Sequence, residues 1–315
     1  MKSNKRIHVQ APAKLNLFLH IISKRKDGYH SLESVFVPIS WCDGIDIENT
    51  NDDLVTRQGE FVCEMKNDLL YKAANLFKKY AHSHLSNSNK KINNLGCRIS
   101  LKKNIPSGAG LGGGSSNAAK TLIILNNMWN VNLPLKELTQ IGKELGADVP
   151  FFLQNESCFV SGIGENIVHL TGKEFLPNYF VILVPEIKVS TQEIFKLFTT
   201  NHYSPSINFS SLGSSQIKLL FKNLISGTWT FGKNDIELVT IKKYPIVKYA
   251  LKLLKKASHT YNLPESSCRM SGTGGSVFCS TPTLDIARKI ANQIRRENTE
   301  KITIKVCKRL NHDTY

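Results

Sequence analysis

The chain has 315 residues, 41% of them hydrophobic, and a formal net charge of +16 at pH 7. That length can bury one large core or two ordinary ones, and the apolar runs, such as Tyr179 to Val184, are too short to span a bilayer. Seven cysteines without a C-x-x-C pair argue against a disulfide framework and a zinc knuckle, and favour reduced, mostly buried thiols in a cytoplasmic protein.

The positive charge would suit an anionic partner such as a nucleotide, a nucleic acid or a membrane surface. The lysines are scattered, however, and the densest clusters, at 24–26 and 252–256, are short. Most of the charge is therefore predicted to lie on a solvated surface, with no nucleic acid and no membrane as partner. The basic first residues lead into I-H-V-Q without the apolar core of a signal peptide.

An alternating run opens the chain. Lys14, Asn16, Phe18 and His20 fall on one face of a predicted strand, with leucines at 15, 17 and 19 on the other. The turn D-G-Y-H at 27–30 leads into a second alternating run at 32–39. Taken alone, a strand lysine beside an asparagine usually faces water, so alternation by itself assigns this pair no chemistry.

Short strands and turns are predicted for residues 43–64, and an amphipathic helix begins at Asp68. Asn67 or Asp68 is of the residue type that caps such a helix. The H-S-H sequence at 82–84 lies in a polar stretch with no third metal ligand nearby, which favours a loop over a metal site.

The stretch at 105–122 reads I-P-S-G-A-G-L-G-G-G-S-S-N-A-A-K-T-L and follows a strand predicted at 97–105. Its five glycines free the backbone to turn N–H groups into a concavity that fits phosphate oxygens. A helix is predicted to start with Ser115, Ser116 and Asn117, whose side chains either cap its first turn or touch the phosphate. The sequence therefore predicts a phosphate-binding loop.

Common templates for such loops fit poorly. Gly114 stands where the Walker motif requires lysine, and Ser115 stands where a protein-kinase loop requires valine. A G-x-G-x-x-G pattern begins at Gly108, but it is separated from the strand by Pro-Ser and is followed by no acidic residue at the usual distance. A flexible linker is disfavoured because the glycines run directly into an apolar helical pattern.

After this loop, one helix is predicted to end near Trp129 and another to run from Pro134 to Gly146. G-A-D-V-P-F-F-L then places Asp148 beside a short apolar turn, where an aspartate is most often a cap or turn residue. A turn at 161–166, a strand at 179–184, helices at 214–224, 244–257 and 284–296 and a strand at 302–307 are predicted in the second half. The sequence R-M-S-G-T-G-G-S-V-F at 269–278 predicts a glycine turn between two strands, for which a simple hairpin is one interpretation.

The loop sequence P-S-G-A-G-L-G-G-G-S-S-N-A-A is similar to the ATP-binding loop of the GHMP kinases, the superfamily of galactokinase, homoserine kinase, mevalonate kinase and phosphomevalonate kinase. The run P-A-K-L-N-L-F-L-H-I-I-S-K-R-K-D-G-Y-H-S-L-E-S-V-F resembles the N-terminal motif of one branch, the 4-diphosphocytidyl-2-C-methyl-D-erythritol kinases. D-V-P and R-M-S-G-T-G-G resemble two further motifs, so the resemblance covers nearly the full chain. Ser23 departs from it, since the branch generally has glycine there.

The resemblance implies an α+β fold of two domains. Residues 1–165 would form a ribosomal-protein-S5-domain-2-like lobe with the ATP loop and the catalytic aspartate. Residues 166–315 would form a ferredoxin-like lobe that completes the substrate site. Sequence pattern alone supports only mixed strands and helices in two lobes.

The resemblance also implies roles for individual residues. Lys14 and Asp148 would be catalytic. ATP would be bound by Asp68, where the family usually has asparagine, by Lys103 and by the loop residues Pro106, Ser107, Gly108, Ala109, Gly110, Leu111, Gly112, Gly113, Gly114, Ser115, Ser116 and Asn117. The substrate would be bound by Asn16, Tyr29, His30, Thr191, Phe195, Gly272, Thr273 and Gly274. Core packing is a rival role for Phe195.

The implied reaction is ATP-dependent phosphorylation of the 2-hydroxyl of 4-diphosphocytidyl-2-C-methyl-D-erythritol, a step of the non-mevalonate route to isoprenoid precursors. A kinase for another small alcohol, such as mevalonate or homoserine, is the alternative within the superfamily, which the D-G-Y-H turn disfavours. Mg²⁺ would accompany ATP without an all-protein cage, with Ser115 or Ser116 as its protein contact. The expected partners are ATP and this cytidine diphosphate ester, bound to a monomer or weak homodimer. A basic nucleic-acid-binding protein is the alternative outside the class.

Overall fold

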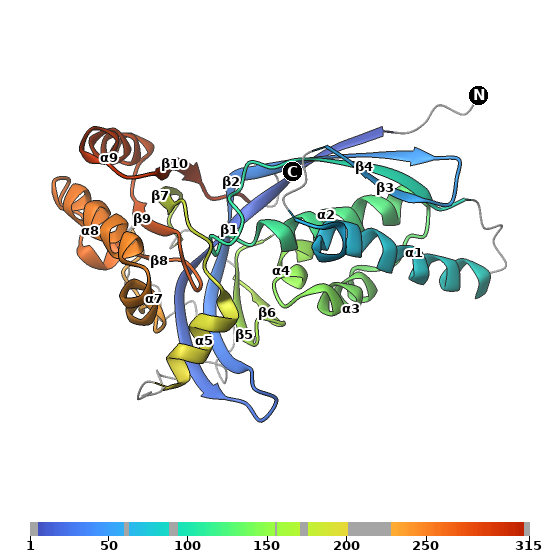
Figure 1. Cartoon of the computed structure of the whole chain (residues 1–315), viewed down its shortest axis with the longest axis horizontal. Helices are drawn as coiled ribbons and strands as arrows, with labels where there is room; N and C mark the ends of the chain where they lie inside the picture. The colour runs from blue at the N-terminus through green and yellow to red at the C-terminus, as the bar shows by residue number, and fades with distance from the viewer. Residues whose placement is uncertain are drawn as a thin grey trace.

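The computed structural model describes residues 6–59, 63–87, 94–154, 156–170, 176–200 and 228–311. Its backbone is built on a long antiparallel hairpin of β1 (Arg6–Lys24) and β2 (His30–Thr50), which runs through the middle of the molecule (Figure 1). The first sheet has the order β3 (Val55–Gln58), β4 (Gly96–Lys102), β2, β5 (Cys158–Gly162) and β6 (Asn166–His169), with β1 paired to β2.

Four helices cover one face of this sheet. They are α1 (Leu69–Asn87), α2 (Gly113–Met128), α3 (Leu135–Leu145) and α4 (Val149–Gln154), and a short 3₁₀ turn, η1 (Met65–Asn67), precedes α1. Ile45 and Ile99 of the sheet pack with Phe77 of α1 and Leu122 of α2 in one buried core. Helix α2 is apolar on most sides because it lies between the sheet and the other helices, so it fixes the residues at its start.

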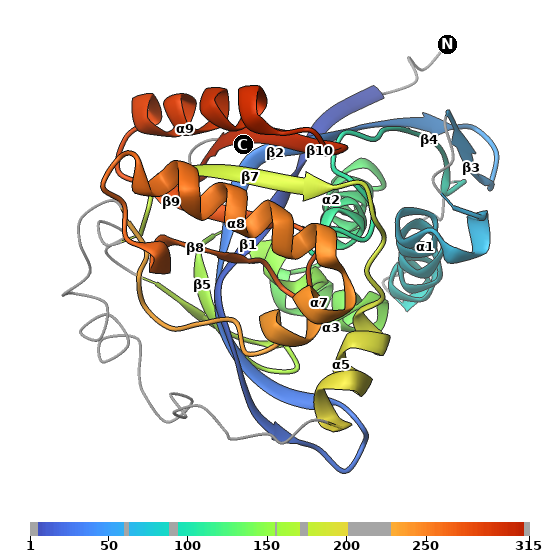
Figure 2. The same ribbon diagram turned by 60° about the vertical axis from the view of Figure 1, so that its left-hand side comes forward.

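The second sheet has the order β10 (Ile302–Lys308), β7 (Tyr179–Pro185), β9 (Val277–Thr281) and β8 (Cys268–Met270), and all of its pairs are antiparallel. In chain order this is 4-1-3-2, the arrangement of a ferredoxin-like lobe. Figure 2 shows α8 (Pro245–His259) and α9 (Leu284–Glu297) over one face, with α7 (Glu237–Lys243) beside α8. The 3₁₀ turn η3 (Glu265–Ser267) leads into β8, and α5 (Thr191–Thr200) follows β7.

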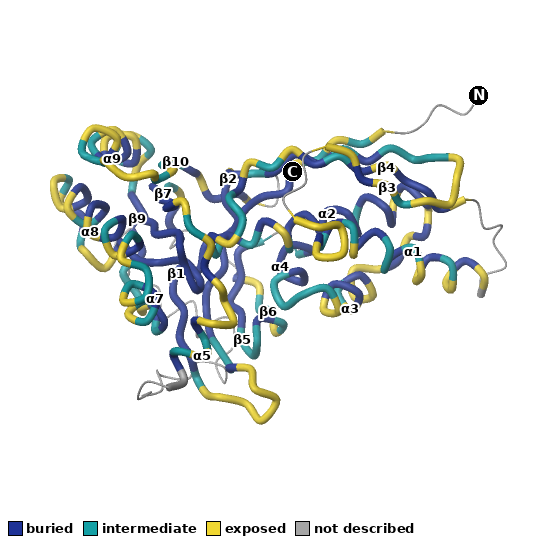
Figure 3. Tube along the Cα trace, viewed as in Figure 1, coloured by how far each residue is buried: buried dark blue, intermediate teal, exposed yellow. Residues whose placement is uncertain are grey.

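The two sheets pack face to face, and the alternation of β7 explains how. Phe180 and Ile182 point into a core shared with Leu15 and Val35 of the first sheet, whereas Val181 and its neighbours on the same face pack on α8 and α9. The middle of the β1–β2 hairpin is buried and its tip is exposed (Figure 3). Both faces of β1 are therefore covered around Lys14, which alternation alone did not predict.

Most predicted elements are confirmed within a few residues. The helix expected between Pro134 and Gly146 is α3, with Pro134 and Gly146 at its caps. The loop predicted for H-S-H at 82–84 is wrong, because α1 continues to Asn87. The short turn predicted after Asp148 is a helix, α4, and α2 begins at Gly113 rather than Ser115. The helix predicted at 214–224 lies outside the described residues.

Among the helices described, none combines the length and apolar character needed to cross a bilayer.

Candidate active site

A cleft of about 1280 Å³ lies along the β1–β2 hairpin, bordered by the glycine loop, α5 and the turn after β8. The predicted site residues that line it are Lys14, Asn16, Tyr29, His30, Asp68, Lys103, Pro106, Ser107, Gly108, Ala109, Gly110, Leu111, Gly112, Gly113, Gly114, Ser115, Asn117, Asp148, Thr191, Phe195, Gly272 and Thr273. Ser116 and Gly274 are both buried, and neither borders the cleft. The structure thus gathers segments more than 250 residues apart into one cavity.

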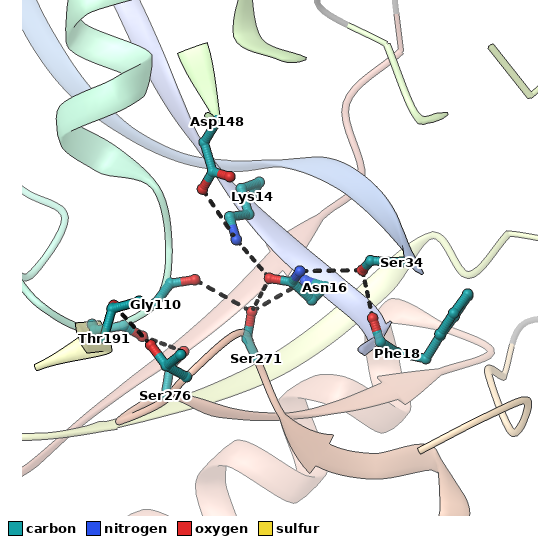
Figure 4. A network of polar contacts seen from close by, with 11 residues as sticks. Lys14, Asn16, Phe18, Ser34, Gly110, Asp148, Thr191, Ser271 and Ser276 are labelled. Atoms are coloured by element: carbon teal, nitrogen blue, oxygen red, sulfur yellow. Dashed lines mark hydrogen bonds and ion pairs between the residues drawn. The ribbon is translucent and has the colours of Figure 1, made fainter. Parts of the chain in front are cut away.

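Lys14, Asn16 and Asp148 form the polar centre of the cleft (Figure 4). Lys14 Nζ donates to Asn16 Oδ1 at 2.6 Å and lies 3.5 Å from Asp148 Oδ2 and 4.5 Å from the centre of the Phe36 ring. The Lys14 side chain is 5% exposed, whereas that of Asp148 is 32% exposed. The buried cation therefore orients a carboxylate that remains open to a ligand.

Asn16 is held by two serines, one on β2 and one in the turn after β8. Its Nδ2 donates to Ser34 Oγ at 3.1 Å, and its backbone N–H donates to Ser271 Oγ at 3.1 Å. Ser271 also lies 3.5 Å from Gly110 O, which links the turn after β8 to the glycine loop (Figure 4). These contacts fix the amide beside Lys14. Sequence reasoning missed both serines; for Ser271 the adjoining glycine motif was the only signal.

Two glycines in the loop are required by close packing. Gly110 has φ +75°, and a Cβ there would lie 2.6 Å from Ser271 O and 2.8 Å from Gly274 O. Gly112 has φ +70°, and its Cβ would lie 2.9 Å from Phe152 Cζ and 3.1 Å from Lys14 Cγ. Left-handed backbone and absent Cβ atoms let the loop pass between Lys14 and the second sheet.

The start of α2 leaves its first-turn N–H groups available to an anion. Gly112 is the N-cap and no side chain caps the helix, so the structure does not bear out the capping alternative for Ser115, Ser116 and Asn117. Ser115 borders the cleft, and Asn117 Nδ2 instead donates to Asp43 Oδ2 at 3.1 Å. Uncapped N–H groups and the positive end of the helix dipole suit a phosphate.

Asp43 is a buried residue that sequence reasoning missed entirely. Its carboxylate also accepts from Lys103 Nζ at 2.5 Å and from the backbone N–H groups of Asn104 and Ile105, each at 2.8 Å. Burial lowers the pKa of Lys103, and the nearby Asp43 opposes this shift. W-C-D-G carries no recognisable motif, so nothing in the local sequence pointed to this role.

Asp68 is engaged within the protein. Its Oδ1 accepts from Leu70 N at 3.0 Å, which confirms the capping interpretation, and its Oδ2 forms an ion pair with Arg57 of β3. Both residues are nearly buried at the edge of the cleft beside Asn67. The contact of Asp68 with adenine stays a prediction.

The far end of the cleft is aromatic. His30 stacks on Phe195 with ring centroids 5.1 Å apart and an interplanar angle of 22°. Phe195 borders the cleft and also packs against the buried cluster that contains Ile194, so it has both of the roles expected for it. Burial, with a smaller effect of Lys24, lowers the pKa of His30, and its buried Nε2 has no hydrogen-bond partner among the described residues. Tyr29, on the hairpin tip, is 61% exposed. This end offers flat rings and one imidazole nitrogen.

Between the two ends, α5 and the turn after β8 meet across the cleft wall. Thr191 Oγ1 lies 3.0 Å from Thr273 Oγ1. Thr240 Oγ1 donates to Thr273 O at 3.1 Å, and Asn234 Nδ2 donates to Gly272 O at 2.7 Å. These bonds hold the predicted substrate-binding turn in one position.

Comparison with known proteins identifies both the glycine loop and the fold. Residues 68–156 match the GHMP kinases N terminal domain. A solved homoserine kinase from Cytophaga hutchinsonii shares the fold with a TM-score of 0.64 over 99% of this chain and 96% of its own, at 16% identity. The fold and the glycine loop are those of a GHMP kinase.

Curated relatives of this chain are named as one particular branch of the GHMP kinases. The 4-diphosphocytidyl-2-C-methyl-D-erythritol kinase of Tolumonas auensis is 36% identical over 89% of this chain and 86% of its own length. That of Polynucleobacter asymbioticus is 40% identical over 86% and 82%. A solved 4-(cytidine 5'-diphospho)-2C-methyl-D-erythritol kinase is 27% identical, with a TM-score of 0.72 over 96% and 99% of the two chains. The chain belongs to the 4-diphosphocytidyl-2-C-methyl-D-erythritol kinase family.

Proposed function

We propose that this protein transfers the γ-phosphoryl group of ATP to the 2-hydroxyl of 4-diphosphocytidyl-2-C-methyl-D-erythritol, a step of the non-mevalonate route to isoprenoid precursors. The observation that carries the proposal is the order of groups along one cleft. An anion-binding helix start and a Lys14–Asp148 pair lie near one another, and the His30–Phe195 stack lies at the far end. Family membership supports the same reaction.

The donor phosphates are assigned to the loop at 106–114 and the first turn of α2. Their charge would be met by backbone N–H groups, the helix dipole and the ammonium of Lys103, which borders the cleft. Preformed donors of this kind need no reorganisation when the anion arrives, which favours binding of the transition state.

The chemical step needs a hydroxyl oxygen in line with the γ-phosphorus and an acceptor for its proton. Asp148 would accept the hydroxyl proton as the oxygen bonds to phosphorus and ADP leaves. Lys14 Nζ, 3.5 Å from this carboxylate, would polarise the same hydroxyl. Asn16 would hold the Lys14 ammonium in place by accepting its hydrogen bond. The two side chains that act on the hydroxyl thus come from β1 and from the start of α4.

Magnesium is assigned to this site only together with ATP. The described residues contain no group of three or more His, Cys, Asp or Glu side chains that could hold a metal ion. Ser115, which borders the cleft on the first turn of α2, fits an ion whose other ligands are phosphate oxygens and water. Bound there, Mg²⁺ would neutralise phosphate charge.

The acceptor base is assigned to the aromatic end. A cytosine would stack on Tyr29 or Phe195 and bond to His30 Nε2, which has no hydrogen-bond partner among the described residues. Thr191, Gly272 and Thr273 would face its diphosphate, with Gly274 behind them shaping the turn. We assign residues 1–165 to the first lobe and 166–315 to the second, with β6 (Asn166–His169) adding its strand to the sheet of the first lobe. The protein is proposed to be cytoplasmic, and a monomer or a weak homodimer.

One assay tests the proposal. Purified protein is incubated with Mg·ATP and, separately, the cytidine diphosphate ester, free methylerythritol, mevalonate and homoserine. Mass spectrometry is expected to detect addition of one phosphate to the cytidine diphosphate ester. Phosphorylation of another alcohol in its place would contradict the proposed acceptor while keeping the kinase activity.

A further inference from the structure

Asp43 lies in the middle of β2 with no exposed surface, and each of its carboxylate oxygens serves a different part of the phosphate site. Oδ1 accepts from the N–H groups of Asn104 and Ile105, immediately before the glycine loop. Oδ2 accepts from Lys103 Nζ and from Asn117 Nδ2 on the first turn of α2. A single carboxylate therefore ties the entry of the loop, the start of the helix and the nearby lysine together.

Lys103 lies next to the start of α2, so its charge affects the proposed phosphate site. A Cβ on Gly113 would lie 2.9 Å from Lys103 Nζ, so the ammonium stands beside the first residue of α2. An ammonium and the positive end of a helix dipole repel each other unless an anion lies between or beside them. Among the described residues, Asp43 is the carboxylate that pairs with that ammonium, at 2.5 Å.

The electrostatic consequence has a definite sign. Burial lowers the pKa of Lys103, and Asp43 followed by Asp68 raises it. Without the charge of Asp43, Lys103 would lose its proton at a lower pH than in the native protein. A neutral amine in that place would contribute far less to phosphate binding than an ammonium does.

We propose that Asp43 is a positioning residue for the donor nucleotide, which keeps Lys103 charged and aimed at the phosphates while it clamps the glycine loop to α2. This inference rests on the proposed ATP-binding role of the cleft. It assigns to Asp43 a function beyond packing, since a merely structural carboxylate would stabilise the fold without altering the pH range in which ATP binds.

The substitution Asp43→Asn separates the effect of Asp43 on the charge of Lys103 from its role in holding the fold. The amide oxygen can still accept from Asn104 and Ile105, and Asn117 can rotate its amide because its Oδ1 has no hydrogen-bond partner among the described residues. Only Lys103 loses its charge partner. The measurement is calorimetric titration with Mg·ATP without acceptor, repeated across pH, with thermal unfolding recorded for each variant.

We expect Asp43→Asn to weaken Mg·ATP binding by about tenfold, the size of one lost charge-assisted hydrogen bond. The alkaline limb of the binding profile should move to lower pH. In a Lys103→Met background, the same substitution should cost less than about twofold more, because the two side chains act as one unit. The matched control is Asp46→Asn on the same strand, where the carboxylate pairs with Arg6 at the surface and lies outside the cleft; it should bind ATP as the native protein does.

A folded Asp43→Asn protein with native ATP affinity, or with weaker binding but an unmoved alkaline limb and full additivity with Lys103→Met, would overturn the inference. If Asp43→Asn does not fold, Asn117→Ala tests the clamp from the helix side and should weaken ATP binding severalfold; native affinity there would also overturn it. Because no acceptor is present, a protein that phosphorylates a different alcohol would fail the proposed function and leave this result standing.

Discussion

The two ends of the cleft are built in opposite ways. At the donor end, charges are buried and already paired: Asp43 holds Lys103 and Asn117, and Gly110 and Gly112 fit between neighbouring atoms without room for a side chain. At the base end, Tyr29 is largely exposed, and His30 and Phe195 contact each other through ring faces. The end proposed for ATP is therefore built from paired polar groups and close packing, whereas the end proposed for the base is built from ring faces, one of them largely exposed.

The largest effect is expected where the two ends meet. Asp148→Asn should lower kcat by roughly a hundredfold or more, because the carboxylate that accepts the hydroxyl proton is lost. Affinity for Mg·ATP should stay near native, since the glycine loop is unchanged. Adding Lys14→Met should cost little more, because residues that act as a unit are not additive. Near-native turnover by a correctly folded Asp148→Asn protein would remove this carboxylate from the mechanism.

The end of the cleft proposed for the base can be tested with an acceptor that lacks the cytidine diphosphate group. Free methylerythritol should be a very poor substrate at any concentration, because one base–aromatic stack alone contributes about 1–3 kcal/mol and the remote base helps to align the hydroxyl. Steady-state kinetics should therefore reveal a loss of kcat as well as a higher KM. His30→Ala should narrow the difference between the two acceptors, since it harms only the one with a base. Equal kcat/KM for both acceptors in the native protein would favour a general small-alcohol kinase.

At the end of the cleft proposed for ATP, adding a single methyl group to the glycine loop should weaken nucleotide binding. Gly112→Ala should weaken ATP binding by about tenfold, because a left-handed backbone disfavours alanine and the new Cβ approaches buried Phe152 and Lys14. Calorimetric titration measures the change. Gly44→Ala on β2 is the matched control, since its Cβ would meet only ordinary contacts at 3.5 and 3.6 Å. If both variants bind ATP equally well, the loop geometry is not what holds the phosphates.

The smallest expected effect is on the pH dependence of stability, through His30 at the end of the cleft proposed for the base. Burial lowers the pKa of His30 below its ordinary value of 6.5, so the unfolded chain takes up a proton there before the folded protein does. Its contribution to the free energy of unfolding is therefore present above about pH 6.5 and lost as the pH falls below it. The melting temperature of His30→Gln should fall less than that of the native protein on acidification.

Sequence reasoning succeeded where a short local pattern carries the geometry. Alternation put Lys14 and Asn16 on one face of β1, and their side chains do meet; the glycines before α2 predicted the left-handed turns of the loop. It failed for contacts made across the fold. Asp43 reaches Lys103 and Asn117 over 60 and 74 residues, and no local spacing encodes such a distance.

Polar composition also misled the assignment of helix ends. H-S-H at 82–84 looked like a loop, but Ala81 and Leu85 of the same turn are buried against the sheet and extend α1. Asp148 precedes a helix rather than a turn because Val149, Phe151 and Phe152 are drawn into the core under α2. Tertiary burial decided both cases, against the local preference.

The β1–β2 hairpin sets the distance between the two ends of the cleft along β2, although the register of β1 shifts between Asn16 and Leu19 and again between Ile21 and Ser23. Asn16 lies opposite Phe36, and His30 lies six residues further along β2, which is about 20 Å of extended strand. Under the proposed function, this length of strand sets the distance between the reacting hydroxyl and the base. An acceptor with one phosphate instead of two between polyol and base should reach His30 or Asp148, but not both at once.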